Sequence, residues 1–458
     1  MIYQNNEFEN TQNAFFRAIK DLKLSVLLRN SNISKSCGVP VSVLFNFLLL
    51  LAFQGKNLFR FLNSNRKEKA NSKNTYYRFL SNNSYNWIKF LSLLSCKVIS
   101  YFSHLTKPDR VKAFVIDDSV FKRNCSKNVE LLAKVFDHAG HSFVKGFTML
   151  TLGWTDGYSF VPVGFNLLSS AKESNRYQEA NDKLDKRSNG YKIRKQSMLS
   201  KPKATIKLLK NALDSGIIAE YVLMDTWFTN EPMFKSISEL GLEVIWMVKQ
   251  LKQRYIYNEK SYTLVQLQRL VKFSKVSDIL GSLKVTTKDA IQVKIVFVKN
   301  RNKKSECLYI LCTDMTLSDE EIVRIYGNRW SIECFFKAIK SLMKLETEFQ
   351  VRDYMSIYAH TTIVFTRYVI IEYIRRNTND LKSQGEIFYV CCEDIQDMDF
   401  SIALRSLMII LTDIFKELPK KITRMIESQL SNWIASQSSY INNLFRNLCW
   451  ESWVIYRT

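Results

Sequence analysis

One stretch of the chain carries four polar residues at helical spacing. Gaps of 3, 4 and 7 positions separate Tyr326, Arg329, Glu333 and Lys340. At about 100° per residue these side chains fall on a stripe about 60° wide that borders the apolar face of an α-helix. A carboxylate, two cations and a phenol along one helix edge could hold a metal ion and phosphate groups. The same spacing also suits a surface ion pair between Arg329 and Glu333, and spacing alone leaves both interpretations open.

Two aspartates follow short apolar runs that are typical of β-strands. Asp117 closes the run AFVID, with Asp118 directly after it, and Asp225 closes YVLMD. Ligands bind at the carboxyl ends of parallel strands, although an aspartate at a strand end is more often a turn former or a helix cap. With Glu333 these two acids would supply the hard oxygen ligands that Mg²⁺ or Mn²⁺ prefers. Two such ions can activate a water or a 3′-hydroxyl at a phosphodiester and stabilise the leaving oxygen.

The charge of the chain favours a polyanionic partner. Its 458 residues include 66 Lys and Arg against 43 Asp and Glu, a formal net charge of +23. Hydrophobic residues make up 46% of the chain, so this charge belongs to folded domains and not to a disordered tail. Residues 60–80 mix basic and aromatic side chains, which suits nucleic acid but equally a solvated helix–loop–helix. Residues 171–203 are basic and lack an apolar period, so we predict a long loop or lid.

Several classes of protein are disfavoured. The first residues have no secretory signal pattern, and the apolar run at 41–53 is shorter than the roughly 20 residues of a membrane-spanning helix. Nine cysteines without a CxxC pair indicate reduced thiols in a cytoplasmic protein. His138 and His141 form an HxxH pair with no evident third ligand, so we do not expect a zinc site.

The pattern of elements predicts a mixed α/β protein. Residues 1–105 look all-helical, and a β-type run begins near Val111 and continues into two strands around a turn at Thr155–Gly157. Strand, helix and strand then follow in short order up to residue 250, which indicates a parallel βαβ unit. Residues 251–317 are β-like. A capping box at Ser318 and Glu321 opens a helix that runs to about Leu345, and the rest of the chain looks helical.

The segment YGNRWSIECFFKAIK resembles the Tyr-Arg-Glu-Lys signature of bacterial insertion-sequence DDE transposases, of the insertion sequence family four type. All four spacings match, and the flanking pattern matches at Trp330, Ile332, Phe335 and Ala338. FVIDDS resembles the family's first-aspartate strand, which assigns Asp117 and leaves Asp118 as the rival. VLMDTWF resembles the second-aspartate segment. The resemblance covers roughly residues 105–360.

This resemblance implies an RNase H-like catalytic core with a β-rich insertion and helical flanks. The implied regions are 1–105 for binding DNA ends, 106–250 and 318–375 for the core, 251–317 for the insertion and 376–458 for a helical region with a possible role in dimerisation.

The implied activity is cut-and-paste transposition. A homodimer would bind terminal inverted repeats, cleave the DNA and join the freed 3′-hydroxyl to target DNA. The resemblance assigns two Mg²⁺ or Mn²⁺ ions to Asp117, Asp225 and Glu333, and phosphate contacts to Tyr326, Arg329 and Lys340. The setting would be the nucleoid of a bacterial cytoplasm. The alternatives are an inactive or domesticated DNA-binding protein, and an RNase H-like nuclease without strand transfer.

Overall fold

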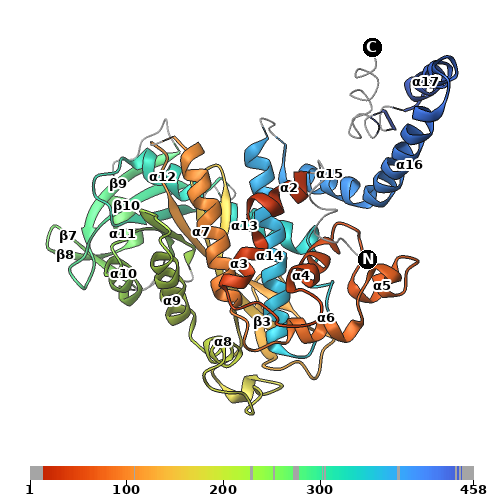
Figure 1. The fold of residues 1–458 in the computed structure, drawn as a ribbon. Helices are drawn as coiled ribbons and strands as arrows, with labels where there is room; N and C mark the ends of the chain where they lie inside the picture. The colour runs from red at the N-terminus through yellow and green to blue at the C-terminus, as the bar shows by residue number, and fades with distance from the viewer. Residues whose placement is uncertain are drawn as a thin grey trace.

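The computed structural model describes residues 14–107, 109–226, 231–250, 253–271, 278–301, 303, 306–378, 382–438, 441–442 and 445. The protein is a mixed α/β structure built on one large twisted sheet, with helices packed against it and a helical arm at the C-terminal side (Figure 1). The predicted fold class is therefore confirmed.

Five strands form the centre of the sheet. They are β1 (Ala113–Lys122), β3 (Ser142–Thr155), β4 (Phe160–Leu168), β5 (Tyr221–Met224) and β6 (Glu243–Val248). β3 lies antiparallel between β1 and β4, whereas β5 and β6 run parallel to β1 on its other side. The order β4-β3-β1-β5-β6, with helices α9 (Lys201–Asp214) and α10 (Glu231–Ser238) before and after β5, is that of an RNase H-like core. β2 (Ala133–Asp137) shares the outer edge of β3 with β4.

The β-like segment after residue 250 continues this sheet. β11 pairs antiparallel with β6, and the sheet then runs on through β10, β9, β7 and β8. The bounds are β7 (Arg254–Tyr257), β8 (Lys260–Thr263), α11 (Leu264–Leu270), β9 (Ile279–Thr286), β10 (Gln292–Lys299) and β11 (Cys307–Cys312). The insertion thus shares backbone hydrogen bonds with the core.

A buried helix joins the core to the helices before it. α14 (Tyr354–Asn377) is buried around almost its whole circumference and contacts α2, α4, α6, α7 and β4. The other helices before and within the core are α2 (Ala14–Asp21), α3 (Leu24–Asn30), α4 (Val41–Leu50), α5 (Leu58–Leu62), α6 (Lys73–Leu80), α7 (Trp87–Leu105), α12 (Asp319–Gly327) and α13 (Trp330–Ser341). Short 3₁₀ helices lie at Lys67–Lys69 and Glu173–Asn175. The helical start of the chain is confirmed over the described residues, and so is the capping box at Ser318.

Three local predictions were wrong. The helix predicted from Ser318 to about Leu345 is interrupted at Asn328 and Arg329, so it forms the two helices α12 and α13, and the second ends at Ser341. β1 does not end at Asp117 but continues to Lys122, because its second half still pairs with β3. Residues 171–203 are not one loop: α8 (Asn189–Ser197) and the start of α9 lie within them. α8 docks through the buried Arg194, whose guanidinium pairs with Glu130 at 2.6 Å. An ion pair therefore docks this helix, which has no apolar stripe in its sequence.

The C-terminal helices are α15 (Gln384–Gln396), α16 (Met398–Glu417) and α17 (Lys420–Ala435). α15 packs against α14, and α16 and α17 project from the rest of the molecule (Figure 1). No helix in the described parts of the chain is both long enough and apolar enough to cross a membrane. The eight cysteines in those parts are free thiols.

Candidate active site

Asp117 and Asp225 lie side by side on neighbouring strands. The parallel pairing of β1 and β5 ends one position before each of them. Paired strands lie about 4.8 Å apart, so the two backbones hold the carboxylates close together. One oxygen of Asp117 accepts the N–H of Asp118 at 2.8 Å, and one of Asp225 accepts the N–H of Thr226 at 2.7 Å. The other two residues of the motif after Asp225, Trp227 and Phe228, lie outside the described residues.

Helices α12 and α13 bring the predicted stripe to these acids. α13 packs on β1 and β4. Arg329 donates from one guanidinium nitrogen to Asp117 at 3.3 Å and from another to Glu333 at 2.6 Å. Its guanidinium lies 5.9 Å from the ring centre of the buried Tyr326. The Arg329–Glu333 ion pair of the surface-pair interpretation is present. However, the Arg329 side chain is only 14% exposed, and it also pairs with Asp117 on β1.

Lys340 lies further along β1 than the other residues of the stripe. Its ammonium donates to the carbonyl oxygen of Val120 at 2.6 Å and pairs with Glu346 at 3.1 Å. Asp117, Tyr326, Arg329 and Glu333 are therefore gathered at one place, with Asp225 beside Asp117.

Neighbouring positions on a strand face opposite sides, and this separates Asp117 from Asp118. Asp117 faces Arg329 on α13, whereas Asp118 pairs with Lys201 of α9 at 2.9 Å. Sequence reasoning missed Lys201 because its partner is 83 positions away. It also missed Arg123, which donates to the carbonyl oxygen of Glu346 at 2.6 Å and fixes the loop after α13. No spacing in the sequence signals either contact.

The site perturbs the acidity of two of its members. Burial raises the pKa of Asp117 to about 7, and the nearby carboxylates of Asp118 and Asp225 also raise it. The backbone N–H of Asp118 and the guanidinium of Arg329 lower this pKa, but by less. Burial, together with nearby Asp225 and Asp117, also raises the pKa of Tyr326. A bound cation would therefore favour the ionised form of Asp117, because without it the negative charge lies in a largely buried site beside two other carboxylates.

The donor set fits a divalent metal ion by its chemistry. Asp117, Asp225 and Glu333 offer only carboxylate oxygens, which Mg²⁺ and Mn²⁺ prefer. Their side chains are not closed around a common point: across the described part of the chain, no three potential ligands gather tightly enough to hold an ion. His138 and His141 stay outside this set. His138 packs edge-on against Phe136, and His141 occupies a turn with a φ of 47°.

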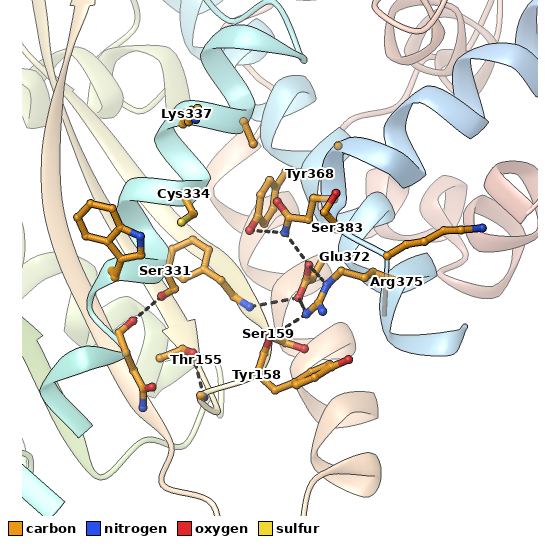
Figure 2. A pocket seen from close by; sticks show the side chains of 18 of the residues that line it. Thr155, Tyr158, Ser159, Ser331, Cys334, Lys337, Tyr368, Glu372, Arg375 and Ser383 are labelled. Atoms are coloured by element: carbon orange, nitrogen blue, oxygen red, sulfur yellow. Dashed lines mark hydrogen bonds and ion pairs between the residues drawn. The ribbon is translucent and has the colours of Figure 1, made fainter. Parts of the chain in front are cut away.

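A cavity of about 780 Å³ lies next to α13 (Figure 2). Cys334 and Lys337 line it from α13, Tyr158 lines it from the turn between β3 and β4, and Glu372 and Arg375 form an ion pair at 2.7 Å in its wall. None of the three candidate metal-binding acids lines this cavity. The candidate site is therefore the carboxylate group on β1, after β5 and on α13.

Comparison with known proteins gives two family matches. A model described as DDE superfamily endonuclease matches residues 47–260, and one described as Transposase DDE domain matches residues 200–370. The first includes Asp117 and Asp225, and the second includes Asp225 and Glu333. Comparison with curated protein sequences gives no match.

Among solved structures, the chain is similar to one titled Drosophila P element transposase strand transfer complex. The identity is 10%, over 85% of this chain and 92% of that one, with a TM-score of 0.22. A TM-score this low carries no argument about fold or function.

Proposed function

Two matches to DDE enzymes support a DDE transposase, and we propose that this chain cleaves DNA at the ends of its own insertion sequence and joins them to target DNA. The observation that carries the proposal is that Arg329 joins two carboxylates from distant parts of the chain, Asp117 and Glu333, while Asp225 follows the strand next to Asp117. The coupling of Asp117 to Asp225 across β1 and β5, and to Glu333 through Arg329, supports one shared site.

The three acids have a common role in this proposal. Asp117, Asp225 and Glu333 would hold divalent metal ions, two Mg²⁺ or Mn²⁺, which when bound activate a water or a 3′-hydroxyl and stabilise the leaving oxygen. The orientation of Asp117 toward α13 supports it as the ligand, whereas Asp118 is engaged with Lys201 on the opposite face. The Tyr-Arg-Glu-Lys signature of the insertion sequence family four type is part of this proposal.

The remaining residues of the stripe would hold DNA. Arg329 already bridges two carboxylates with separate nitrogens, a geometry that suits bidentate binding of a phosphate. The Tyr326 hydroxyl would contact the DNA backbone beside the phosphate that Arg329 binds. Lys340, next to Val120, would bind the following phosphate as a point charge.

The helical region before residue 105 would recognise the inverted repeats. The basic side chains Arg60, Lys67, Lys73 and Arg78 are exposed there. Among the aromatic residues of this segment, Phe61, Tyr76 and Phe79 are buried, whereas Tyr77 is partly exposed. This segment therefore supports phosphate contacts made by its cations, and its aromatic rings serve the core.

A homodimer in the DNA complex is supported by the C-terminal arm. The apolar residues Phe400, Leu407, Ile410 and Ile414 follow one another along one side of α16 and are about half exposed. A second copy of this helix would cover them. We place the protein in the bacterial cytoplasm, on nucleoid DNA.

Single alanine variants test the catalytic assignment. Asp117→Ala, Asp225→Ala and Glu333→Ala should each abolish Mg²⁺-dependent cleavage of a duplex that carries the DNA flanking the coding region, while binding to that duplex persists. Asp118→Ala is the matched control and should retain cleavage, since its carboxylate faces α9. Full strand transfer by the Glu333→Ala protein would refute the assignment. Cleavage without joining by the wild-type protein would favour a nuclease.

A further inference from the structure

The hairpin of β2 and the first part of β3 has two different faces. Val135 lies opposite Val144 on one face and packs with Val120 of β1 in a small apolar cluster. On the other face Phe136 lies opposite Phe143, and Lys134 lies opposite Lys145. One face thus anchors the hairpin to β1, and the other presents two rings and two cations.

The outward face is exposed and aromatic. Phe143 is 62% exposed and Phe136 is 38% exposed, with ring centres 5.2 Å apart. The Lys134 ammonium lies 4.6 Å from the ring centre of Phe143, and the Lys145 ammonium lies 4.9 Å from that of Tyr177, which is itself 45% exposed. Rings and cations therefore form one continuous patch, which we name the hairpin patch (Lys134, Phe136, Phe143, Lys145 and Tyr177).

The charge of the hairpin patch favours an anionic partner. Two lysines directly opposite each other on paired strands repel, which an anion between them would relieve. Three acids close to the hairpin are already neutralised: Asp137 by Lys122 at 2.7 Å, Glu130 by Arg194 at 2.6 Å and Glu179 by Arg176 at 2.9 Å. They are not free to cancel the charge of the patch.

The hairpin patch lies on the same side of the sheet as the candidate active site. Asp117 pairs with Thr151 of β3, and alternation along the uninterrupted strand places Lys145 and Phe143 on the face of Asp117. Six to eight residues at about 3.4 Å each set the patch about 20–27 Å from Asp117 along the strand. A duplex rises about 3.4 Å per base pair, so this distance corresponds to about six to eight base pairs.

We propose that the hairpin patch is a second contact for the DNA held at the active site. This inference rests on the proposed function. Lys134 and Lys145 bind phosphates of the backbone, and Phe136 and Phe143 pack against sugars and base edges in the adjacent groove. The contact is to duplex DNA about six to eight base pairs from the scissile phosphate, and it makes no use of the metal-binding acids.

Binding to a fluorescein-labelled 40-base-pair duplex, measured by anisotropy over a range of salt concentrations, tests the contact. The double variant Lys134→Gln with Lys145→Gln should weaken binding. It should also reduce the slope of log K against log salt concentration by about 1.8, because each lost phosphate contact removes about 0.9. Phe136→Ala with Phe143→Ala should weaken binding roughly tenfold with the slope unchanged, since it removes packing without charge. Lys284→Gln with Lys299→Gln, exposed residues of β9 and β10 with the same change in charge, is the matched control.

A photoreactive p-benzoylphenylalanine placed at Phe143 gives a readout independent of affinity. Crosslinking to the duplex, with melting temperatures of the variants equal to that of the wild type, supports the contact. If the wild type binds and cleaves DNA while both hairpin variants match the control and no crosslink forms, the hairpin inference is wrong and the proposed function stands. A change in oligomeric state with DNA binding unaltered would mean that the patch contacts protein, which also overturns it. Failure of the wild type to bind DNA overturns both.

Discussion

Arg367 is a buried charged residue whose replacement should destabilise this fold strongly. Its side chain is 0% exposed. It donates to the carbonyl oxygens of Leu48 and Leu49 at the end of α4 and of Met343 after α13, at 2.6–2.9 Å. It also pairs with both oxygens of Glu348, which is equally buried. One guanidinium thus connects α4, the segment after α13 and α14.

Arg367→Met keeps most of the volume and removes the charge. Glu348 is then left ionised and buried without its partner. This should lower the free energy of unfolding by about 3–5 kcal/mol. Arg301→Met is the matched control: that guanidinium is 85% exposed and pairs with Asp278 at 2.8 Å, so its loss should cost at most about 1 kcal/mol. Unfolding in urea, followed by circular dichroism, measures both.

The stability difference between Arg367→Met and the wild type should depend on pH. Burial alone would raise the pKa of Glu348, but Arg367 and His360 hold it below its usual value in the folded protein. The wild-type pair therefore stabilises the fold at neutral pH and loses this contribution only as the pH falls through that lowered pKa. Without Arg367 the pKa of Glu348 should rise, so the deficit of the variant should shrink from pH 8 to pH 5. A deficit no larger than that of Arg301→Met, or one that is the same at both pH values, would refute the reasoning.

Two further changes test local packing and the candidate site. Gly153→Ala would bring a Cβ within 2.1 Å of the Phe160 ring, which packs on Phe335 of α13 at 5.2 Å. We expect a loss of about 1–3 kcal/mol in urea unfolding and a fall in cleavage, and an unaltered melting temperature would contradict the packing. Asp117→Asn should stabilise the metal-free protein increasingly from pH 4 to pH 7 and by a constant amount above it. The folded pKa of about 7 lies above the usual 3.8, so the folded state holds a proton in that window that the unfolded state has lost. A stability difference independent of pH would show that Asp117 titrates normally.

The sequence was most informative where chemistry depends on local geometry. The spacing of Tyr326, Arg329 and Glu333 predicted from helix pitch that they lie together, and they do, although Arg329 lies at the break between α12 and α13 and not inside one helix. The antiparallel pair of β3 and β4 was predicted from its turn. The helix that begins after Ser318 was predicted from its cap. These signals lie within a few residues of one another, so no distant partner was needed to interpret them.

The predictions failed or stopped where the partner is far away in the chain. The strand through Asp117 looked finished there because polar residues follow, yet pairing with β3 extends it to Lys122. α8 was missed because a polar helix can dock through a buried ion pair, here Arg194 with Glu130. The hairpin patch gave no signal, since the strand register sets Phe136 beside Phe143 and their exposure depends on what covers that face.

By itself the sequence determined which residues could carry metal and phosphate chemistry, and it supplied the expectation that they act on DNA. Only the tertiary structure decided which of two adjacent aspartates meets Arg329, the residue that also pairs with Glu333. A strand turns neighbouring side chains to opposite sides, and the side that meets α13 depends on how the sheet packs. The same packing set Lys340, about 10 Å along α13 from Glu333, against Val120, which lies about 10 Å along β1 from Asp117.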